Sequence, residues 1–355
     1  MRIPSHSQHS FRGRQRGATL IELMIALLLG LLVVAAASGL FLTNKRVYAS
    51  TETINRIQEN SRVAFEVMAR DIREAGRNPC GNKSVPVSQL KSGSSGWWDN
   101  YFVGLKGYEQ DTNVPGTTPA AGTDVLDVYS AGGAEIYVTE HSNPGADLDV
   151  TSVEGINPPE VLMVCNRELS LIFEATGANA NSKKIIHPGG NSQNCTQRFR
   201  SEYDCTNGNS VHDFCMYVPP GANPAACNGN FSESPAQVAR FQSHRWYVAE
   251  NGRGGRSLYR ATLSGDPAAP TSSTVVEVAE GIVGMQLQYR SGGATAWQSA
   301  AAVADWAAVN AVQVSLSAVG TEGALSGGYL EGTDGNVLTR NVTHVVAIRN
   351  REGVL

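Results

Sequence analysis

The stretch that decides the fold is Arg16-Gly17-Ala18-Thr19-Leu20-Ile21-Glu22-Leu23-Met24, which begins an apolar run that reaches Leu42. Within residues 18–42, the carboxylate of Glu22 is the single charge. At a rise of about 1.5 Å per residue, a helix over these residues is roughly 37 Å long and exceeds the ~30 Å hydrocarbon core of a bilayer. The stretch therefore predicts a membrane-spanning helix with one acidic side chain near its start.

The segment before this helix is basic and contains no acidic residue; its arginines are Arg2, Arg12, Arg14 and Arg16. Positively charged flanks stay on the cytoplasmic side of a membrane. We therefore expect a single-pass membrane protein whose N-terminus is cytoplasmic and whose bulk lies on the other side of the membrane.

Two simpler interpretations of the apolar run were weighed. A secretory signal peptide has an apolar core of about 7–15 residues and a cleavage site of small residues, for which 34–38 would serve. The run is too long for that interpretation. An ordinary anchor leaves Glu22 unexplained, because a carboxylate at the bilayer centre costs about 2.5–3.5 kcal/mol. Glu22 therefore calls for a partner.

The stretch from Gly17 to Leu23 resembles the type III signal of type IV prepilins and pseudopilins. The resemblance implies that a prepilin peptidase cuts between Gly17 and Ala18 and methylates the new amine of Ala18. Residues 1–17 would then be a leader. The family more often has Phe where this chain has Ala18.

Such a cut would free an amine four residues before Glu22. In a helical bundle of subunits, this amine or a neighbour's can pair with the carboxylate. Pairing removes the cost of a lone buried charge and fixes the axial register, as one buried polar residue does in a coiled coil. We therefore expect Glu22 to be an assembly residue.

The helix is expected to continue to about residue 76, giving one helix over 18–76 whose first part, 18–42, spans the membrane or a filament core. One apolar stripe recurs at steps of three and four residues and consists of Ile54, Ile57, Ser61, Ala64, Phe65, Met68, Ile72 and Ala75. The opposite face is charged and is expected to be solvated. Gly76 and Asn78-Pro79 supply the stop.

Residues 77–355 are expected to form a β-rich globular head, because short runs rich in Val, Ile, Leu and Tyr alternate with turn residues. The predicted strands are 124–130, 135–139, 160–165, 169–175, 245–249, 257–261, 274–279, 282–289, 309–318 and 342–349. A polar insertion at about 176–235 interrupts these strands. The pair Trp97-Trp98 is expected to pack in the core.

The predicted fold class is α+β and pilin-like: a long transmembrane helix packed on an antiparallel sheet.

Six cysteines all lie in the exported part: Cys80, Cys165, Cys195, Cys205, Cys215 and Cys227. An even number in an oxidising compartment predicts disulfides, and six cysteines allow fifteen pairings. The last four lie close together, so at least one local disulfide is expected there. The absence of a Cys-x-x-Cys unit argues against zinc.

The chain shows no nucleophile elbow, P-loop, zinc-protease or dinucleotide motif, so we expect neither an enzyme nor a cofactor. The histidines 141, 187, 212 and 244 are scattered and are expected in loops or at the surface. Acidic pairs such as Asp124/Asp127, Asp147/Asp149 and 334–336 do not match a calcium loop. The formal charge is −4, and loss of four leader arginines makes it more negative, so no nucleic-acid partner is expected.

The C-terminal part is similar to minor pilins of the PilW type. The similarity is carried by Leu258-Tyr259-Arg260 at the end of a hairpin, by 280–289, and by a last strand ending in Ile348-Arg349-Asn350. It implies a subunit that helps initiate type IV pilus assembly and sits near the pilus tip, with adhesion and twitching motility as outcomes. The implied partners are other minor pilins, the major pilin, the inner-membrane assembly platform and membrane lipid.

Two alternatives remain open. A minor pseudopilin of the J type, from a type II secretion system, would have the same N-terminus and a similar sheet. An adhesive or DNA-binding tip module would use its head, for which Arg253 and Arg256 at a predicted hairpin tip are the candidates. A solvated turn is the simpler interpretation of these two arginines.

Overall fold

The computed structural model describes residues 17, 19–81, 84–91, 103–110, 117–190, 192–203, 205, 211–222, 224–262, 274–320 and 336–351. Residues 1–16, Ala18 and the pair Trp97-Trp98 lie outside the described residues. The chain divides into two compact units, Met1–Glu52 and Thr53–Leu355. One helix, α1 (Leu20–Arg73), begins in the first unit and ends in the second.

The first unit contains the apolar part of α1. Its large apolar side chains, such as Leu28 and Phe41, are more than half exposed, and no proline interrupts the helix. The segment is long and apolar enough to cross a membrane, by length and composition. The hydroxyl of Thr43 donates to the carbonyl of Gly39 at 2.9 Å, so this polar group is satisfied inside the helix, as a membrane requires.

The second unit buries the predicted stripe of α1. Ala64, Met68 and Ile72 are fully buried. Ile54 was predicted to belong to the stripe, but its side chain is 43% exposed and lies outside the buried part. The helix ends at Arg73, slightly before the expected end. Gly76 follows with a φ of 68°, which glycine adopts without strain, and its N–H donates to the carbonyl of Tyr129.

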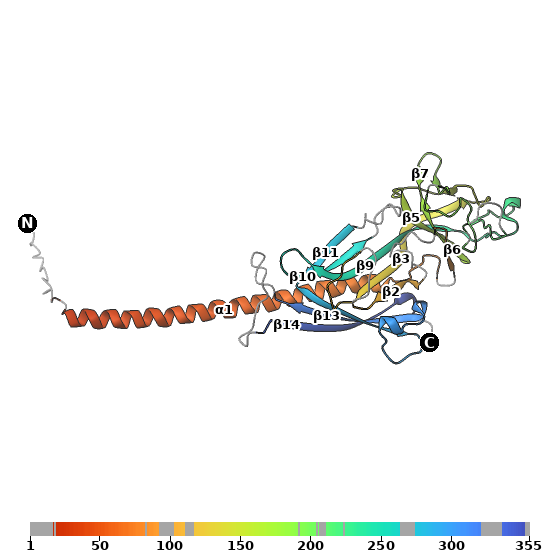
Figure 1. Cartoon of the computed structure of the whole chain (residues 1–355). Helices are drawn as coiled ribbons and strands as arrows, with labels where there is room; N and C mark the ends of the chain where they lie inside the picture. The colour runs from red at the N-terminus through yellow and green to blue at the C-terminus, as the bar shows by residue number, and fades with distance from the viewer. Residues whose placement is uncertain are drawn as a thin grey trace, which may run out of the picture. The chain divides into compact units, whose positions relative to one another are not determined.

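Two sheets enclose this part of α1 (Figure 1). The larger sheet has the strand order β1-β6-β5-β9-β3-β4-β8-β7, with β10 paired to β9 and β11, and β2 paired to β3. Its strands are β1 (Val85–Ser88), β2 (Leu105–Tyr108), β3 (Val125–Glu140), β4 (Leu148–Val150), β5 (Glu160–Cys165), β6 (Leu169–Ala175), β7 (Gly177–Asn179), β8 (Lys184–Ile186), β9 (Gln237–Glu250), β10 (Arg256–Thr262) and β11 (Thr274–Glu280). The named strands pair antiparallel, except that β1 runs parallel to β6.

The smaller sheet has the order β12-β13-β14, with bounds Ile282–Ser291, Val309–Val319 and Thr339–Ala347. Its inner face supplies Met285, Leu287 and Val314 to the core around α1, while Trp246 and Leu258 come from the larger sheet. The indole N–H of Trp246 also donates to the carboxylate of Asp71 at 3.1 Å. Apolar burial and this hydrogen bond together fix α1 within the head.

The predicted strands 160–165 and 169–175 match β5 and β6. The two predictions at 124–130 and 135–139 are parts of one strand, β3, whose pairing with β9 is irregular between Gly132 and Ile136. That irregularity breaks the alternation on which the prediction depended. Five strands of three or four residues, namely β1, β2, β4, β7 and β8, were missed because such short strands show no periodic pattern.

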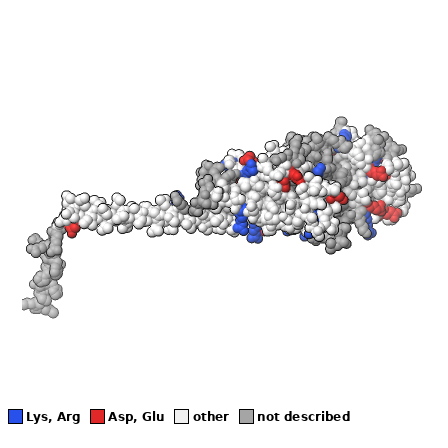
Figure 2. Space-filling view, turned by 60° about the horizontal axis from the view of Figure 1, so that its bottom comes forward, with Lys and Arg blue, Asp and Glu red and all other residues white. Residues whose placement is uncertain are grey.

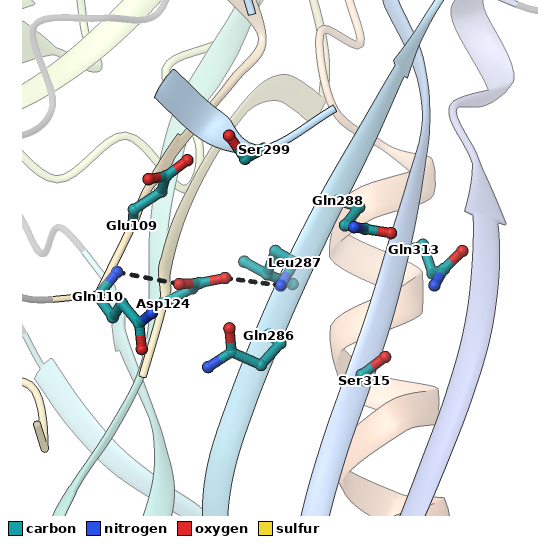
Figure 3. Close-up of a pocket in the computed structure, with 9 residues that line it drawn as sticks. All are labelled: Glu109, Gln110, Asp124, Gln286, Leu287, Gln288, Ser299, Gln313 and Ser315. Atoms are coloured by element: carbon teal, nitrogen blue, oxygen red, sulfur yellow. Dashed lines mark hydrogen bonds between the residues drawn. The ribbon is translucent and has the colours of Figure 1, made fainter. Parts of the chain in front are cut away.

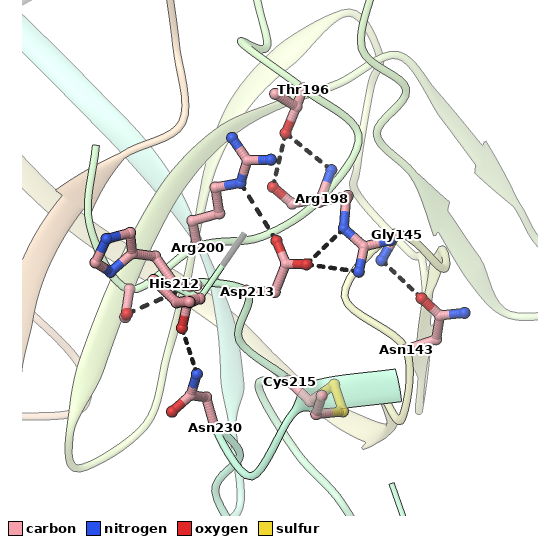
Figure 4. Close-up of polar contacts among 12 residues, drawn as sticks. Asn143, Gly145, Thr196, Arg198, Arg200, His212, Asp213, Cys215 and Asn230 are labelled. Carbon is pink, nitrogen blue, oxygen red and sulfur yellow. Dashed lines mark hydrogen bonds and ion pairs between the residues drawn. A yellow bond between two sulfur atoms is a disulfide. The ribbon is translucent and has the colours of Figure 1, made fainter. Parts of the chain in front are cut away.

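The cysteine-rich insertion is more ordered than its composition predicts. Phe199, Phe214 and Met216 are buried in a core that they share with β5, β6 and β8. Asp213 is fully buried between two arginines, with Arg198 Nε at 2.8 Å and Arg200 Nε at 3.3 Å (Figure 4). The two guanidinium groups compensate the carboxylate for the water it loses on burial.

His141 and His187 lie just after β3 and β8, outside the strands as predicted, but neither is at the surface, because both are buried beside Phe199. His141 Nδ1 accepts the N–H of Met216 at 3.0 Å, and His187 Nε2 lies 2.8 Å from the carbonyl of Ala146. Burial lowers the pKa of His141 to about 3 and that of His187 to about 4. Both imidazoles are therefore neutral at pH 7.

Candidate functional site

The start of α1 is a capping box formed by Thr19 and Glu22. Thr19 precedes the first helical residue, and its hydroxyl accepts the N–H of Glu22 at 3.3 Å. In return, Glu22 Oε2 accepts the N–H of Thr19 at 3.1 Å and its hydroxyl at 3.2 Å. This reciprocal pattern satisfies N–H groups that have no partner within the helix.

The capping box changes the interpretation of Glu22. In the sequence its carboxylate is a lone charge in need of a partner, whereas in the structure it accepts hydrogen bonds from two donors of Thr19, three residues away. A negative charge in the first turn also interacts favourably with the helix dipole. The carboxylate is exposed and accepts both hydrogen bonds through one oxygen, Oε2, so Oε1 accepts none among the described residues.

Thr19 is the functional residue that sequence reasoning missed. The signal was present, because Thr19-Leu20-Ile21-Glu22 before an apolar run has the Thr-x-x-Glu spacing of a capping box. A box at this position defines where the helix starts. It places the start between the expected cleavage point and the carboxylate.

Gly17 lies next to this box and is exposed. A Cβ built on Gly17 would meet no atom within 4 Å. Packing against the described residues therefore does not demand glycine here. Ala18, the residue expected to carry the new amine, lies outside the described residues.

The six cysteine candidates form three disulfides. Cys80–Cys165 joins the segment after α1 to β5 across 85 residues, and the other two are local, Cys195–Cys205 and Cys215–Cys227. Disulfides of this kind each stabilise a fold by about 2–4 kcal/mol, mainly by restricting the unfolded chain. Two local disulfides thus secure the insertion, and the long-range one secures the end of α1.

The other charged candidates from the sequence serve internal contacts. Asp127 accepts two hydrogen bonds from Arg245, at 2.6 and 2.7 Å, with both side chains buried. Arg253 pairs with Glu277 and Glu280. Among the described residues, no group of three or more His, Cys, Asp or Glu side chains is arranged to hold a metal ion.

The hairpin arginines therefore do not form an open basic patch. Arg256 also pairs, with Glu250 at 2.9 Å, so acidic neighbours offset both cations of the 250–256 turn. On the face of the head shown in Figure 2, acidic and basic side chains are mixed over the surface. This distribution favours a solvated turn over a site for nucleic acid.

Comparison with protein families gives two matches. Residues 12–38 match the prokaryotic N-terminal methylation motif, and residues 245–350 match the type IV pilus-assembly protein W family. No curated protein and no solved structure gave a significant match. The first matched region contains Gly17, Thr19 and Glu22, and the second runs from β9 through β14. Together with the apolar helix and the strand-rich, disulfide-bearing head, the two matches support a type IV pilus minor pilin of the PilW type.

Proposed function

We propose that this protein helps to initiate type IV pilus assembly at the inner membrane and then resides in or near the pilus tip complex. The observation that carries the proposal is the processing motif joined directly to the capping box of α1. Pilins are structural subunits, and the proposed role is accordingly one of assembly and not of catalysis.

The proposed mechanism begins with the peptidase, which cuts between Gly17 and Ala18 and leaves a methylated amine on Ala18. In the unassembled subunit, Glu22 is held by Thr19. On assembly, the amine of Ala18 or of a neighbouring subunit would pair with the carboxylate of Glu22. An ion pair in a low-dielectric bundle is strong enough to select one axial register.

The remaining partners follow from the same role. The apolar segment of α1 would contact membrane lipid before assembly and the helices of the major and other minor pilins afterwards, with the assembly platform driving the transfer. The head would be periplasmic first and then exposed at the cell surface. Adhesion and twitching motility would follow from the presence of pili.

A deletion strain tests this role. Loss of the protein should remove most surface pili and twitching motility while secretion of exoproteins continues, and the wild-type gene should restore both. If pili persist and exoprotein release stops instead, the protein is a secretion pseudopilin and the proposal is wrong.

Processing is tested separately. Replacing Gly17 with Leu should leave an uncut precursor that is heavier than the wild-type protein by the 17-residue leader. Mass spectrometry of the wild-type protein should find Ala18 as a methylated N-terminus. A wild-type protein that keeps residues 1–17 would contradict the proposed cut.

A further inference from the structure

A polar cleft of about 380 Å³ lies on the outer face of the smaller sheet (Figure 3). Its floor is formed by the outward side chains of β12 and β13. Its wall is formed by residues that follow β2 and precede β3, and Ser299 lies at its rim. The lining residues are Glu109, Gln110, Asp124, Gln286, Leu287, Gln288, Ser299, Gln313 and Ser315.

The two carboxylates of the cleft hold its walls in place. Asp124 accepts the N–H of Gln110 at 3.0 Å through one oxygen and the N–H of Leu287 at 2.7 Å through the other. Hydrogen bonds from the side chain of Ser299 and from the N–H of Ala301, the latter at 3.0 Å, lower the pKa of the Glu109 carboxyl. Both carboxylates therefore accept backbone hydrogen bonds that hold neighbouring segments of the cleft wall together.

The glutamines are different, because all four have hydrogen-bonding groups that are unused among the described residues. The side-chain amides of Gln110, Gln288 and Gln313 have no hydrogen-bond partner among the described residues. Gln288 and Gln313 lie directly opposite each other on β12 and β13. Gln286 donates to the carbonyl of Gly122 at 2.8 Å, which leaves its own oxygen available.

Each free amide presents donors and an acceptor within one planar group. A ligand that carries both a donor and an acceptor on each polar group, as adjacent sugar hydroxyls do, matches such a row of amides. The lining contains no Lys, Arg or His, so nothing in it would neutralise a phosphate, sulfate or carboxylate. The chemistry of the cleft therefore favours an uncharged hydroxylated ligand.

An aromatic ring lies at the end of this row. Arg290 follows Gln288 by two residues, so its side chain leaves β12 on the same face. Its guanidinium lies over the ring of Trp297, 5.5 Å from the centroid. The guanidinium therefore covers this face of the indole, and neither Arg290 nor Trp297 lines the cleft.

A peptide fits the cleft less well. Peptide recognition by a sheet uses a free strand edge for main-chain pairing and apolar pockets for side chains. The cleft lies on the face of the sheet, and Leu287 is the single apolar residue in its lining. The volume is within the range of small-molecule sites and accommodates one or two sugar rings.

We propose that this cleft binds an uncharged carbohydrate of one or two pyranose units, held by Gln110, Gln288 and Gln313. The proposal goes beyond an assembly role, because it gives the head of a tip subunit a ligand of its own. It does not depend on where the subunit sits in the filament.

The test uses full-length protein in a detergent without a sugar headgroup, such as lauryldimethylamine oxide, so that the detergent does not compete for the cleft. The probes are glucose, galactose, mannose, N-acetylglucosamine and their β-linked disaccharides. Sialyllactose, a sulfated disaccharide and an uncharged decapeptide serve as comparison ligands. Saturation-transfer NMR identifies binding, and titration gives Kd.

At least one neutral sugar should bind, and Gln288→Leu and Gln313→Leu should each weaken its binding by about tenfold or more. Ser317→Ala is the matched control, since Ser317 lies on the same face of β13 outside the cleft and its replacement should leave Kd unchanged. Equal thermal unfolding of all variants would show that the fold survives. The proposal is overturned if no neutral sugar binds, if the decapeptide or an anionic sugar binds instead, or if the Gln variants bind as the wild type does.

Discussion

The two parts of α1 differ in how far the chain itself buries their apolar side chains. In the first unit, apolar residues such as Leu28 surround the helix and remain exposed, and Glu22 is satisfied within a single turn. In the head, Met68 and its stripe are buried by strands far away in the sequence. The comparison shows that the head buries its apolar stripe within the chain, whereas the first unit leaves its apolar side chains exposed.

Charged groups in the two regions differ in how far away in the sequence their partners lie. Glu22 bonds to a residue three positions away, whereas Asp127 pairs with Arg245 across 118 residues in the core. Removing the head pair should therefore destabilise the fold, and removing Glu22 should not.

The largest effect is expected for Asp127→Ala, which leaves the guanidinium of Arg245 buried without its partner. We expect the free energy of unfolding of the head to fall by about 3–5 kcal/mol. Glu22→Ala is the matched variant and should change it by less than about 0.5 kcal/mol. Urea unfolding followed by tryptophan fluorescence measures both, and similar values for the two variants would contradict the contrast.

A second pair of variants compares apolar residues. Met68→Ala should lower the free energy of unfolding by about 3 kcal/mol, because Met68 is fully buried and its loss leaves a cavity. Leu28→Ala should have no measurable effect on head unfolding, since Leu28 is 63% exposed. If Leu28→Ala lowered the free energy of unfolding as much as Met68→Ala does, the first unit would also have to bury its apolar side chains within the chain.

A smaller effect is expected from acid acting on the buried histidines. An unfolded histidine titrates near pH 6.5, whereas the native pKa values are about 3 for His141 and about 4 for His187. Below pH 6.5 the unfolded chain binds more protons than the native one. Stability is therefore full above about pH 6.5 and falls on acidification by up to about 1.4 kcal/mol per pH unit for each histidine, until the native pKa is reached.

Unfolding measured between pH 7.5 and pH 4.5 tests this dependence. His187→Phe keeps an aromatic ring beside Phe199 and should remove about half of the acid-dependent loss. His344→Gln is the control, because His344 is exposed on β14 and no buried imidazole is removed. If His187→Phe lost stability on acidification as steeply as the wild type, the loss could not be attributed to the buried imidazole of His187.

The sequence predicted what depends on contiguous residues. The methylation motif, the apolar run and the stripe of α1 are local patterns, and the strands 160–165 and 169–175 have clear composition. The burial of His141 and His187 was not predictable, because it arises from β3, β8 and the insertion packing together. The disulfide pairing and the polar cleft likewise depend on which distant segments become neighbours.

The capping box is an instructive exception, because it is local and was still missed. Glu22 drew attention as a charge in an apolar segment, and that question obscured its spacing from Thr19. The two roles, helix cap and assembly charge, can be separated by substitution. Glutamine can replace glutamate in a capping box but carries no charge.

Incorporation of Glu22→Gln and Thr19→Ala subunits into purified pili tests the central claim most directly. Both variants should be processed and inserted into the membrane at wild-type levels. If pairing with an amine selects the register, Glu22→Gln should be lost from pili at least tenfold while Thr19→Ala is incorporated nearly normally. Normal incorporation of Glu22→Gln together with loss of Thr19→Ala would show that the carboxylate acts only as a helix cap and would contradict the account.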